Sequence, residues 1–326
     1  MKFTADRNDL AVAVTNARMG IPANPEHPVR AGMQITGGNE IAFTGSDGDV
    51  TFTSWLKAEA SGEIVVPGKI FTEVVHSLPD HPVTVESDTS LAVIRSGSSQ
   101  FRLPLIREEY PQTARTADPV GTIDGKVFVA AMNKVAPAAS SVDQNPALHA
   151  VKAELSGRTL TLVATDHYRL STTTLDWSTS RPDGECLIPG WAISKFTSGA
   201  EGSVTLGWDD RVATMQADNF TVTSRLIGGK FPSWRQLIPS QAPVTSASGP
   251  DFLAALKRAQ LTVDQDGTMT LRFTRGGLII EAGHGNRFSE VVSLRAWEDD
   301  DFEAQFGLKY LIDGVTGCGD TCGFVL

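Results

Sequence analysis

Ala164-Thr165-Asp166-His167-Tyr168-Arg169-Leu170-Ser171 is the stretch that decides the fold of this chain. Before it, residues 159–164 alternate between more and less apolar side chains. Residues 170–175 form a second short run that reads as a strand. Alternation with a period of two is typical of β-strands, and a polar corner between two such runs indicates a tight turn. The stretch therefore predicts two strands that meet at a polar corner near the middle of the chain.

The same corner pattern occurs three times in the sequence. Counterparts lie at residues 45–50 and 282–287, and a spacing of roughly 120 residues each time indicates a repeat architecture. Each corner follows an amphipathic helix pattern and precedes a strand that leads into a second helix, with Pro67 and Pro189 expected in the opening turn of two of them. The first helices are predicted at residues 8–19, 125–139 and 250–261, and the strand-to-helix passages at residues 64–71, 186–193 and 304–311.

These repeats predict an α+β fold of three similar modules, each with two helices on one face of an antiparallel sheet. The expected modules are residues 1–117, 118–242 and 243–326, joined by linkers rich in Pro, Ala, Ser and Thr. The third pattern stops in the strand after its second helix, roughly thirty residues earlier than the second pattern does. A C-terminally incomplete third module is therefore expected.

The composition narrows the class of protein. At 326 residues the chain can form two or three cores, and sparse aromatic residues with recurring Val and Thr favour many short strands. The formal charge of −10 argues against a surface that is basic all over, although one basic face remains possible. No positively charged leader precedes an apolar run, and no run approaches the ~20 apolar residues that span a bilayer, so we expect a cytoplasmic protein without membrane contact.

Neither a catalytic site nor a metal site is predicted. Cys186, Cys318 and Cys322 cannot make a disulfide framework, and no further Cys/His pair completes a metal site with the last two. Asp166 and His167 are adjacent and would point to opposite faces of an extended chain, and no nucleophile or phosphate-binding motif occurs. We therefore expect a non-enzymatic protein without cofactor or metal.

Three motifs and the threefold repeat resemble the sliding clamp family, the beta subunit of bacterial DNA polymerase III. The motifs are Met1-Lys2-Phe3-Thr4, the central corner, and Gly229-Lys230-Phe231-Pro232-Ser233-Trp234-Arg235-Gln236-Leu237-Ile238-Pro239. The resemblance covers essentially the whole chain and is closer to high-GC Gram-positive members, or to a phage or resistance paralogue among them. It implies that the protein is a non-catalytic processivity factor. It also implies a head-to-tail homodimer, in which six modules form a ring and the helices line the hole. It also implies that the replicative polymerase, the clamp loader and repair proteins bind through short linear motifs.

Within such a ring, basic residues on the inner helices would hold duplex DNA in an otherwise acidic protein. Topology would supply the attachment, and loose, salt-sensitive phosphate contacts that read no base would permit sliding. Scattered basic residues are otherwise most often a solvated surface. The residues on or beside the predicted helices are Arg7, Arg18, Lys69, Lys126, Lys134, Lys195, Lys257, Arg258 and Lys309.

The resemblance also implies a partner-docking site at the central corner, beside the boundary of the second and third modules. Apolar residues of the set would make a hole for Leu or Phe anchors, and Thr165 and Arg169 would supply polar contacts at its rim. The set is Leu148 from a strand over residues 146–148, together with Thr165, His167, Tyr168, Arg169, Leu170, Pro232, Arg235, Gln236 and Leu237. Turn capping explains Asp166 and packing explains Phe231, so both are left out, while strand termination remains the structural alternative for the others.

Ring closure requires a contact between the first module of one copy and the third module of the other. By the resemblance, Leu78 and Phe101 would face Leu261 and Thr262, although core packing is an equally good interpretation of Phe101 alone. Two functions stay open at this point: a replicative sliding clamp, and a clamp-like paralogue that acts as a peptide-binding hub.

Overall fold

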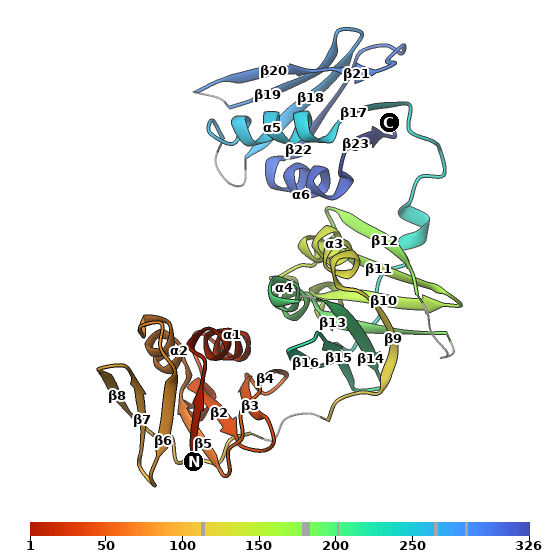
Figure 1. Ribbon diagram of the computed structural model, residues 1–326. Coiled ribbons are helices and arrows are strands. Elements are labelled where there is room, and N and C mark those ends of the chain that lie inside the picture. The colour runs from red at the N-terminus through yellow and green to blue at the C-terminus, as the bar shows by residue number, and fades with distance from the viewer. Residues whose placement is uncertain (112–114, 178–182, 201, 264–266, 284–285) are drawn as a thin grey trace. The chain divides into compact units, whose positions relative to one another are not determined.

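The computed structural model describes residues 1–111, 115–177, 183–200, 202–263, 267–283 and 286–326. Helices and antiparallel sheets recur along these residues, which confirms the predicted α+β class (Figure 1). The corners at residues 45–50 and 164–169 join consecutive strands as predicted. Part of the third corner, residues 284–285, lies outside the described residues.

The predicted helices are present, two in each repeat. The α-helices are α1 (Arg7–Arg18), α2 (Gly68–Ser77), α3 (Gly125–Val135), α4 (Gly190–Gly199), α5 (Gly249–Ala259) and α6 (Leu308–Cys318). Short 3-10 helices are η1 (Pro28–Ala31), η2 (Ala136–Ala138), η3 (Pro146–His149) and η4 (Trp234–Leu237). Among the described residues, no helix has the length and apolar content needed to cross a membrane.

Local capping explains where these helices begin. The Asp6 carboxylate accepts hydrogen bonds from the backbone N–H groups of Asn8 and Asp9, which satisfies two of the free donors at the start of α1. Pro67 and Pro189 stand at the N-cap of α2 and α4, one residue before the predicted position. The reason is that each proline is also the last residue of the preceding strand.

Within the described residues the strands form five sheets, and the neighbours in the first, the eight-stranded and the two C-terminal sheets pair antiparallel. In the order of hydrogen-bonded neighbours, the first four-stranded sheet is β1 (Lys2–Ala5), β6 (Val83–Ser87), β7 (Leu91–Ser96) and β8 (Ser99–Pro104). The eight-stranded sheet is β5 (Glu63–Pro67), β2 (Gly32–Thr36), β3 (Ile41–Ser46), β4 (Val50–Leu56), β16 (Phe220–Arg225), β15 (Val212–Gln216), β14 (Ser203–Trp208) and β9 (Pro119–Asp124). The other sheets are β12 (Leu170–Asp176), β11 (Thr159–Thr165), β10 (Ala150–Ser156) and β13 (Gly184–Pro189); β21 (Leu294–Arg295), β17 (Thr245–Ser248) and β23 (Thr321–Phe324); and β20 (Phe288–Val292), β19 (Gly277–Ala282), β18 (Thr268–Thr274) and β22 (Phe302–Gly307).

The eight-stranded sheet joins strands of the first and second repeats. Its junction is the antiparallel pair β4 and β16, in which Val222 lies opposite Phe52 and Phe220 lies opposite Ser54. Both strands already have a partner on their other side, β3 and β15, so the pair leaves neither strand with a free edge. The first and second repeats therefore share one hydrogen-bonded sheet.

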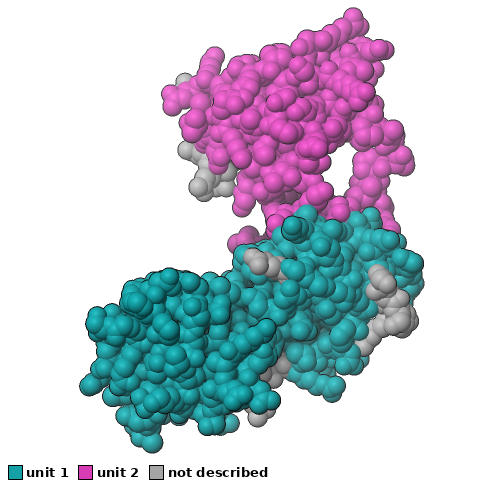
Figure 2. Space-filling model, viewed as in Figure 1, with its two compact units in different colours: residues 1–132, 152–161, 174–228 teal, residues 133–151, 162–173, 229–326 magenta. Residues whose placement is uncertain are grey.

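The chain divides into two compact units that do not follow the three repeats (Figure 2). The first unit contains residues 1–132, 152–161 and 174–228, and the second contains residues 133–151, 162–173 and 229–326. The shared sheet gives the physical reason, because β4 and β16 belong to one unit while the central corner belongs to the other. The module boundaries at 117 and 242 remain predictions.

Two sequence predictions about particular residues are wrong. Residues 146–148, predicted as a strand, lie in η3, because the Asn145 side chain accepts a hydrogen bond from the N–H of Ala147 and Pro146 occupies the first turn. Leu78, predicted at a dimer interface, is buried at 4% exposure in the core of the first repeat. An amphipathic pattern cannot separate these cases, because a strand-edge leucine and a core leucine look alike in sequence.

Helix α1 shows how the core of the first unit is built. Leu10, Val14 and Ala17 lie at helical spacing on its buried face, against an apolar cluster that contains Ile35 and Phe43. Val12, on the same helix, is 49% exposed. Burial therefore differs sharply between two valines that are two residues apart.

We expect Val14→Ala to lower the free energy of unfolding by about 2 kcal/mol, because two buried methyl groups are lost and a cavity remains. Val12→Ala is the matched control and should stay within about 0.5 kcal/mol, since it changes helix propensity equally at an exposed site. Urea denaturation followed by circular dichroism measures both variants. Equal losses would contradict the assignment of the buried face.

Candidate functional site

The central corner is a tight turn organised by Asp166. Its Oδ1 atom accepts hydrogen bonds from the backbone N–H groups of Tyr168 at 3.1 Å and Arg169 at 3.0 Å. The Thr165 hydroxyl donates to the carbonyl oxygen of Arg169 at 2.6 Å, and His167 adopts a left-handed conformation with φ of 73°. The capping role predicted for Asp166 is confirmed, and Thr165 is buried inside the turn.

The same aspartate device recurs at other corners of the chain. Asp47, Asp88 and Asp209 each accept hydrogen bonds from the backbone N–H groups two and three residues later. These bonds favour the charged carboxylate, so they lower the pKa of Asp88 and of Asp209. The aspartate turn is therefore a general way to join strands in this fold and does not by itself mark a functional site.

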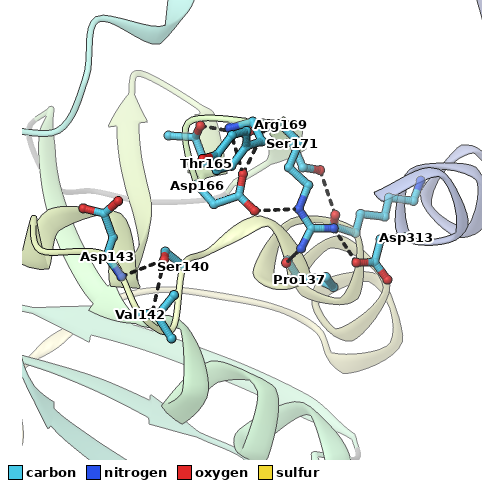
Figure 3. Close-up of polar contacts among 11 residues, drawn as sticks. Pro137, Ser140, Val142, Asp143, Thr165, Asp166, Arg169, Ser171 and Asp313 are labelled. Carbon is cyan, nitrogen blue, oxygen red and sulfur yellow. Dashed lines mark hydrogen bonds and ion pairs between the residues drawn. The ribbon is translucent and has the colours of Figure 1, made fainter. Parts of the chain in front are cut away.

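Arg169 distinguishes the central corner from the others. Its Nε atom donates to Asp166 Oδ2 at 3.0 Å, while its two terminal nitrogens donate to Asp313 Oδ2 and to the carbonyl oxygen of Pro137 (Figure 3). The Arg169 side chain is only 16% exposed, and those of Asp166 and Asp313 are 12% and 28% exposed. One guanidinium thus links the corner to η2 and to α6, which follows it by more than a hundred residues.

Two tyrosines cover this ion pair. The Arg169 guanidinium carbon lies 4.6 Å from the centre of the Tyr310 ring, which is cation–π distance. The Tyr168 ring stacks on Tyr310 with centroids 6.3 Å apart, and Tyr168 itself is 81% exposed. An exposed aromatic residue above an ordered cation is a typical contact surface for a peptide.

A cavity of about 350 Å³ opens beside Arg169. Its walls come from the end of α3, η2, Arg169 with the start of β12, the segment after η4 and one face of α6, and its lining residues all belong to the second compact unit. Its apolar part includes Leu170, Ile238 and the Tyr310 ring. The lining residues are Lys134, Pro137, Ala138, Arg169, Leu170, Ser171, Thr172, Ile238, Tyr310, Asp313, Gly314, Gly317 and Cys318.

The predicted peptide-binding residues divide into three groups around this cavity. Arg169 and Leu170 line it. Leu148 and Thr165 are buried and offer no surface to a ligand. Exposed residues that do not line it are His167, Tyr168, Arg235, Gln236 and Leu237, with Pro232 half-buried.

Sequence reasoning missed the contribution of α6 altogether. Tyr310, Asp313, Gly314 and Gly317 recur at helical spacing and all line the cavity. That spacing, with two glycines in one helix, is the signal that could have identified this face. Lys134, predicted to face DNA, is among the residues that line the cavity.

Several of the other predicted DNA-facing residues bind their own chain. Arg7 donates to the carbonyl of His76, Arg18 to that of Ile21 and Lys195 to that of Met19. Arg258 forms two hydrogen bonds with Glu290, and Lys69 lies 4.0 Å from Glu73. The remaining predicted residues are exposed lysines on α3, α5 and α6, namely Lys126, Lys257 and Lys309.

Of the residues predicted at a dimer interface, two are exposed. Phe101 is 37% exposed on β8, an outer strand of its sheet, and Leu261 is 83% exposed just after α5. Thr262 is half-buried, and its hydroxyl group donates a hydrogen bond to the carbonyl oxygen of Ala259. Phe101 and Leu261 are thus available to a partner, whereas the buried Leu78 is not.

Among the described residues, no group of three or more His, Cys, Asp or Glu side chains could hold an ion. The network at Arg169 pairs its carboxylates with a cation, which fits a structural and docking role better than a catalytic one.

Comparison with known proteins identifies the family. Residues 1–114 match the N-terminal domain, and residues 122–233 the central domain, of the DNA polymerase III beta subunit. The chain is 30% identical over 331 residues to the beta sliding clamp of Streptomyces coelicolor, covering 97% of this chain and 88% of that protein. It is 27% identical over 333 residues to the beta sliding clamp homolog GriR of Streptomyces muensis, covering 97% of this chain and 88% of that protein.

Solved structures show the same fold. The DNA polymerase III beta chain of Streptococcus pneumoniae superposes with a TM-score of 0.85 at 23% identity, covering 98% of this chain and 91% of that chain. The resemblance stated from the sequence motifs is thereby confirmed. The chain belongs to the DNA polymerase III beta subunit family, the bacterial beta sliding clamps, which are non-catalytic processivity factors of DNA replication.

Proposed function

We propose that this clamp closes with a second copy into a ring around duplex DNA and tethers its partners through peptides that dock at the cavity beside Arg169. The cavity is the single observation that supports the docking role best. Its apolar lining residues could receive Leu or Phe anchors, and the Arg169 guanidinium and the exposed Tyr168 lie at one side of it. Leu237, which is also exposed, directly precedes the lining residue Ile238 in the sequence. We propose the replicative polymerase, the clamp loader and repair proteins as the partners, in the cytoplasm.

Strand pairing supports a specific form of ring closure. Within the chain, β4 pairs with β16. By the repeat, β20 is the counterpart of β4 and β8 the counterpart of β16, and both are outer strands of their sheets. We infer that β8 of one copy pairs with β20 of the other, head to tail, which would satisfy both edges. Phe101 on β8 and Val291 on β20 are exposed, as such a contact requires.

The DNA contact proposed for the ring is topological. Six of the nine predicted basic residues bind or line parts of their own chain, so few cations remain for firm phosphate contacts. A formal charge of −10 adds long-range repulsion from DNA. Both observations favour enclosure with loose contacts from residues such as Lys126, Lys257 and Lys309 over adhesion to the duplex.

A clamp-like peptide-binding hub remains the second candidate. The chain is similarly identical to a beta sliding clamp and to the beta sliding clamp homolog GriR, so identity alone does not favour the replicative clamp over the hub. Primer extension on a singly primed template by a polymerase from the same cell separates the two. A replicative clamp should increase the length of DNA that the polymerase synthesises per binding event. A protein that binds the polymerase peptide but leaves the product length unchanged would be a peptide-binding hub.

We expect Gly314→Leu to fill the cavity and lower the affinity for a polymerase-tail peptide containing Gln and Leu by at least about tenfold, or ~1.4 kcal/mol. A Cβ atom at Gly314 meets open space, and leucine favours a helix over glycine, so the fold should persist. Thr316→Leu is the matched control, since Thr316 is exposed on α6 and does not line the cavity. Fluorescence anisotropy measures both, and unchanged affinity of Gly314→Leu would remove the cavity as the docking site.

For ring closure, Phe101→Ala combined with Leu261→Ala should raise the dimer dissociation constant by roughly 10- to 100-fold, because large apolar side chains lose their burial. Val142→Ala, at an 89% exposed loop position, should leave it unchanged. Analytical ultracentrifugation at micromolar concentration follows the equilibrium. A native chain that stays strictly monomeric would refute the ring for this chain.

On DNA, the protein should remain bound to nicked circular plasmid through gel filtration and should leave when the plasmid is cut once. Enclosure explains both results, since a ring can slide off only at an end. A protein that binds linear and circular DNA equally, with a steep salt dependence, would instead be held by phosphate contacts.

A further inference from the structure

The first compact unit contains a cavity of its own, with a volume of about 670 Å³. Its lining comes from three segments of the chain: the stretch before β9, the turn between β14 and β15, and the end of β16 with the residue that follows it. The described residues that line it are Arg115, Asp209, Asp210, Arg211, Val212, Arg225 and Leu226. We call this space the arginine cavity.

Three arginines converge on the arginine cavity, one from each segment. Arg115, Arg211 and Arg225 are all exposed, so a ligand from solution can reach them. A guanidinium group presents a planar fork of N–H donors that matches the two oxygens of a carboxylate. Three positive charges around one space also repel one another, and a negatively charged ligand relieves that repulsion. The cavity therefore favours an anionic ligand, although the chain as a whole has a formal charge of −10.

Hydrogen bonds fix the backbone that carries these arginines. The N–H of Arg211 donates to the Asp209 carboxylate at 2.7 Å, and its carbonyl oxygen accepts from the N–H of Leu226 at 2.8 Å. Two residues after Arg115, the N–H of Ala117 donates to a threonine hydroxyl on β15 at 2.9 Å. A ligand thus meets a preorganised frame in which only the long side chains remain to be ordered.

The nearby carboxylates leave room for a further anion. Asp209 accepts two backbone N–H groups and serves to close its turn. The Arg225 Nε atom lies 3.5 Å from Asp49 Oδ1, but these side chains are 68% and 75% exposed. So exposed an ion pair is weak, and a ligand carboxylate can replace it. Asp210 is exposed on the same turn and brings one opposing charge to the cavity.

The internal repeat relates the arginine cavity to the central corner. Asp49, the ion-pair partner of Arg225, belongs to the corner at residues 45–50. The motif Tyr110-Pro111 matches Phe231-Pro232, so Arg115 is the counterpart of Gln236 in the segment at residues 229–239. Elements equivalent to the central corner and to that segment therefore meet this cavity too, with a different set of charges.

We propose that the arginine cavity binds an acidic segment of a partner protein, whose Asp and Glu side chains pair with the three arginines. An extended chain spaces its carboxylates along its length, so it can reach guanidinium groups on three segments at once. Its apolar atoms can contact Val212 and Leu226, which also line the cavity. This second docking site goes beyond the proposed function, and it does not depend on the cavity beside Arg169.

The test uses the full chain and a fluorescent peptide, Asp-Glu-Leu-Asp-Glu, followed by fluorescence anisotropy. We expect binding that weakens between about 50 and about 200 mM sodium chloride, because salt screens exposed charge pairs. The amide peptide Asn-Gln-Leu-Asn-Gln should bind at least about tenfold more weakly. No binding of the acidic peptide by the native protein, or equal binding of the two peptides, would overturn the proposal.

Variants locate the binding within the molecule. Arg115→Gln combined with Arg211→Gln should weaken binding at least about tenfold. Arg158→Gln combined with Arg275→Gln is the matched control, since it removes the same charge at exposed positions outside the cavity. Asp210→Asn should strengthen binding about two- to fivefold, a gain that a misfolded protein does not give. Equal losses in the two double variants, or no gain from Asp210→Asn, would overturn the site.

Two competitors decide the class of ligand. A short blunt DNA duplex and inorganic phosphate should each displace no more acidic peptide than sodium chloride does at the same ionic strength. Stronger displacement by either would assign the cavity to phosphate groups and overturn the acidic peptide as its ligand. Gly314→Leu, which fills the cavity beside Arg169, should bind the acidic peptide as the native protein does. Failure of the polymerase-tail peptide to bind would thus refute the proposed function and leave the arginine cavity to be decided by the acidic peptide.

Discussion

The antiparallel pair of β4 and β16 is the interaction on which the first unit depends. An unpaired strand edge carries a row of free N–H and C=O groups, and this pair satisfies two such edges at once. The pair also brings α1 and α4 together, since the Lys195 ammonium group donates to the carbonyl of Met19 at 2.6 Å. A ladder of backbone hydrogen bonds, and not side-chain complementarity alone, therefore sets how the first two repeats meet. A fold that joins repeats in this way has edge strands at its ends, and pairing with a second copy is the simplest way to satisfy them.

A different device operates at the central corner. The aspartate turn there is shared with Asp47, Asp88 and Asp209, so the turn explains the corner and not its function. The addition is Arg169, three residues after the aspartate, which binds back to Asp166 and outward to Asp313. A half-buried guanidinium costs free energy when it has no partner, and so does a half-buried carboxylate. Arg169, Asp166 and Asp313 therefore hold one another in place. The cavity proposed for docking lies against this fixed point.

Much of the fold could be predicted because its signals are local or periodic. Helix positions, the corners and the family followed from apolar spacing and from motifs within a few residues of one another. The pairing of Arg169 with Asp313 could not be predicted, because the two residues lie 144 positions apart in the sequence. No motif around either residue indicates a contact with the other. Leu148 and Leu78 were placed on surfaces although they are buried, since an apolar residue gives the same signal in a core and at an interface. Residues 146–148 form a 3-10 helix although the sequence predicts a strand there, because the Asn145 side chain caps the first turn.

The composition of α6 explains why the cavity lies at the central corner. Gly314 and Gly317 both line it, and glycine inside a helix costs roughly 1 kcal/mol relative to alanine. The equivalent helices avoid this cost, since α2 has no glycine after its first residue and α4 has none between its first and last residues. Burial of Leu308 and Val315 against α5 offsets the loss in α6. Side chains at 314 and 317 would fill space beside Arg169, so the cavity exists because both positions are glycine.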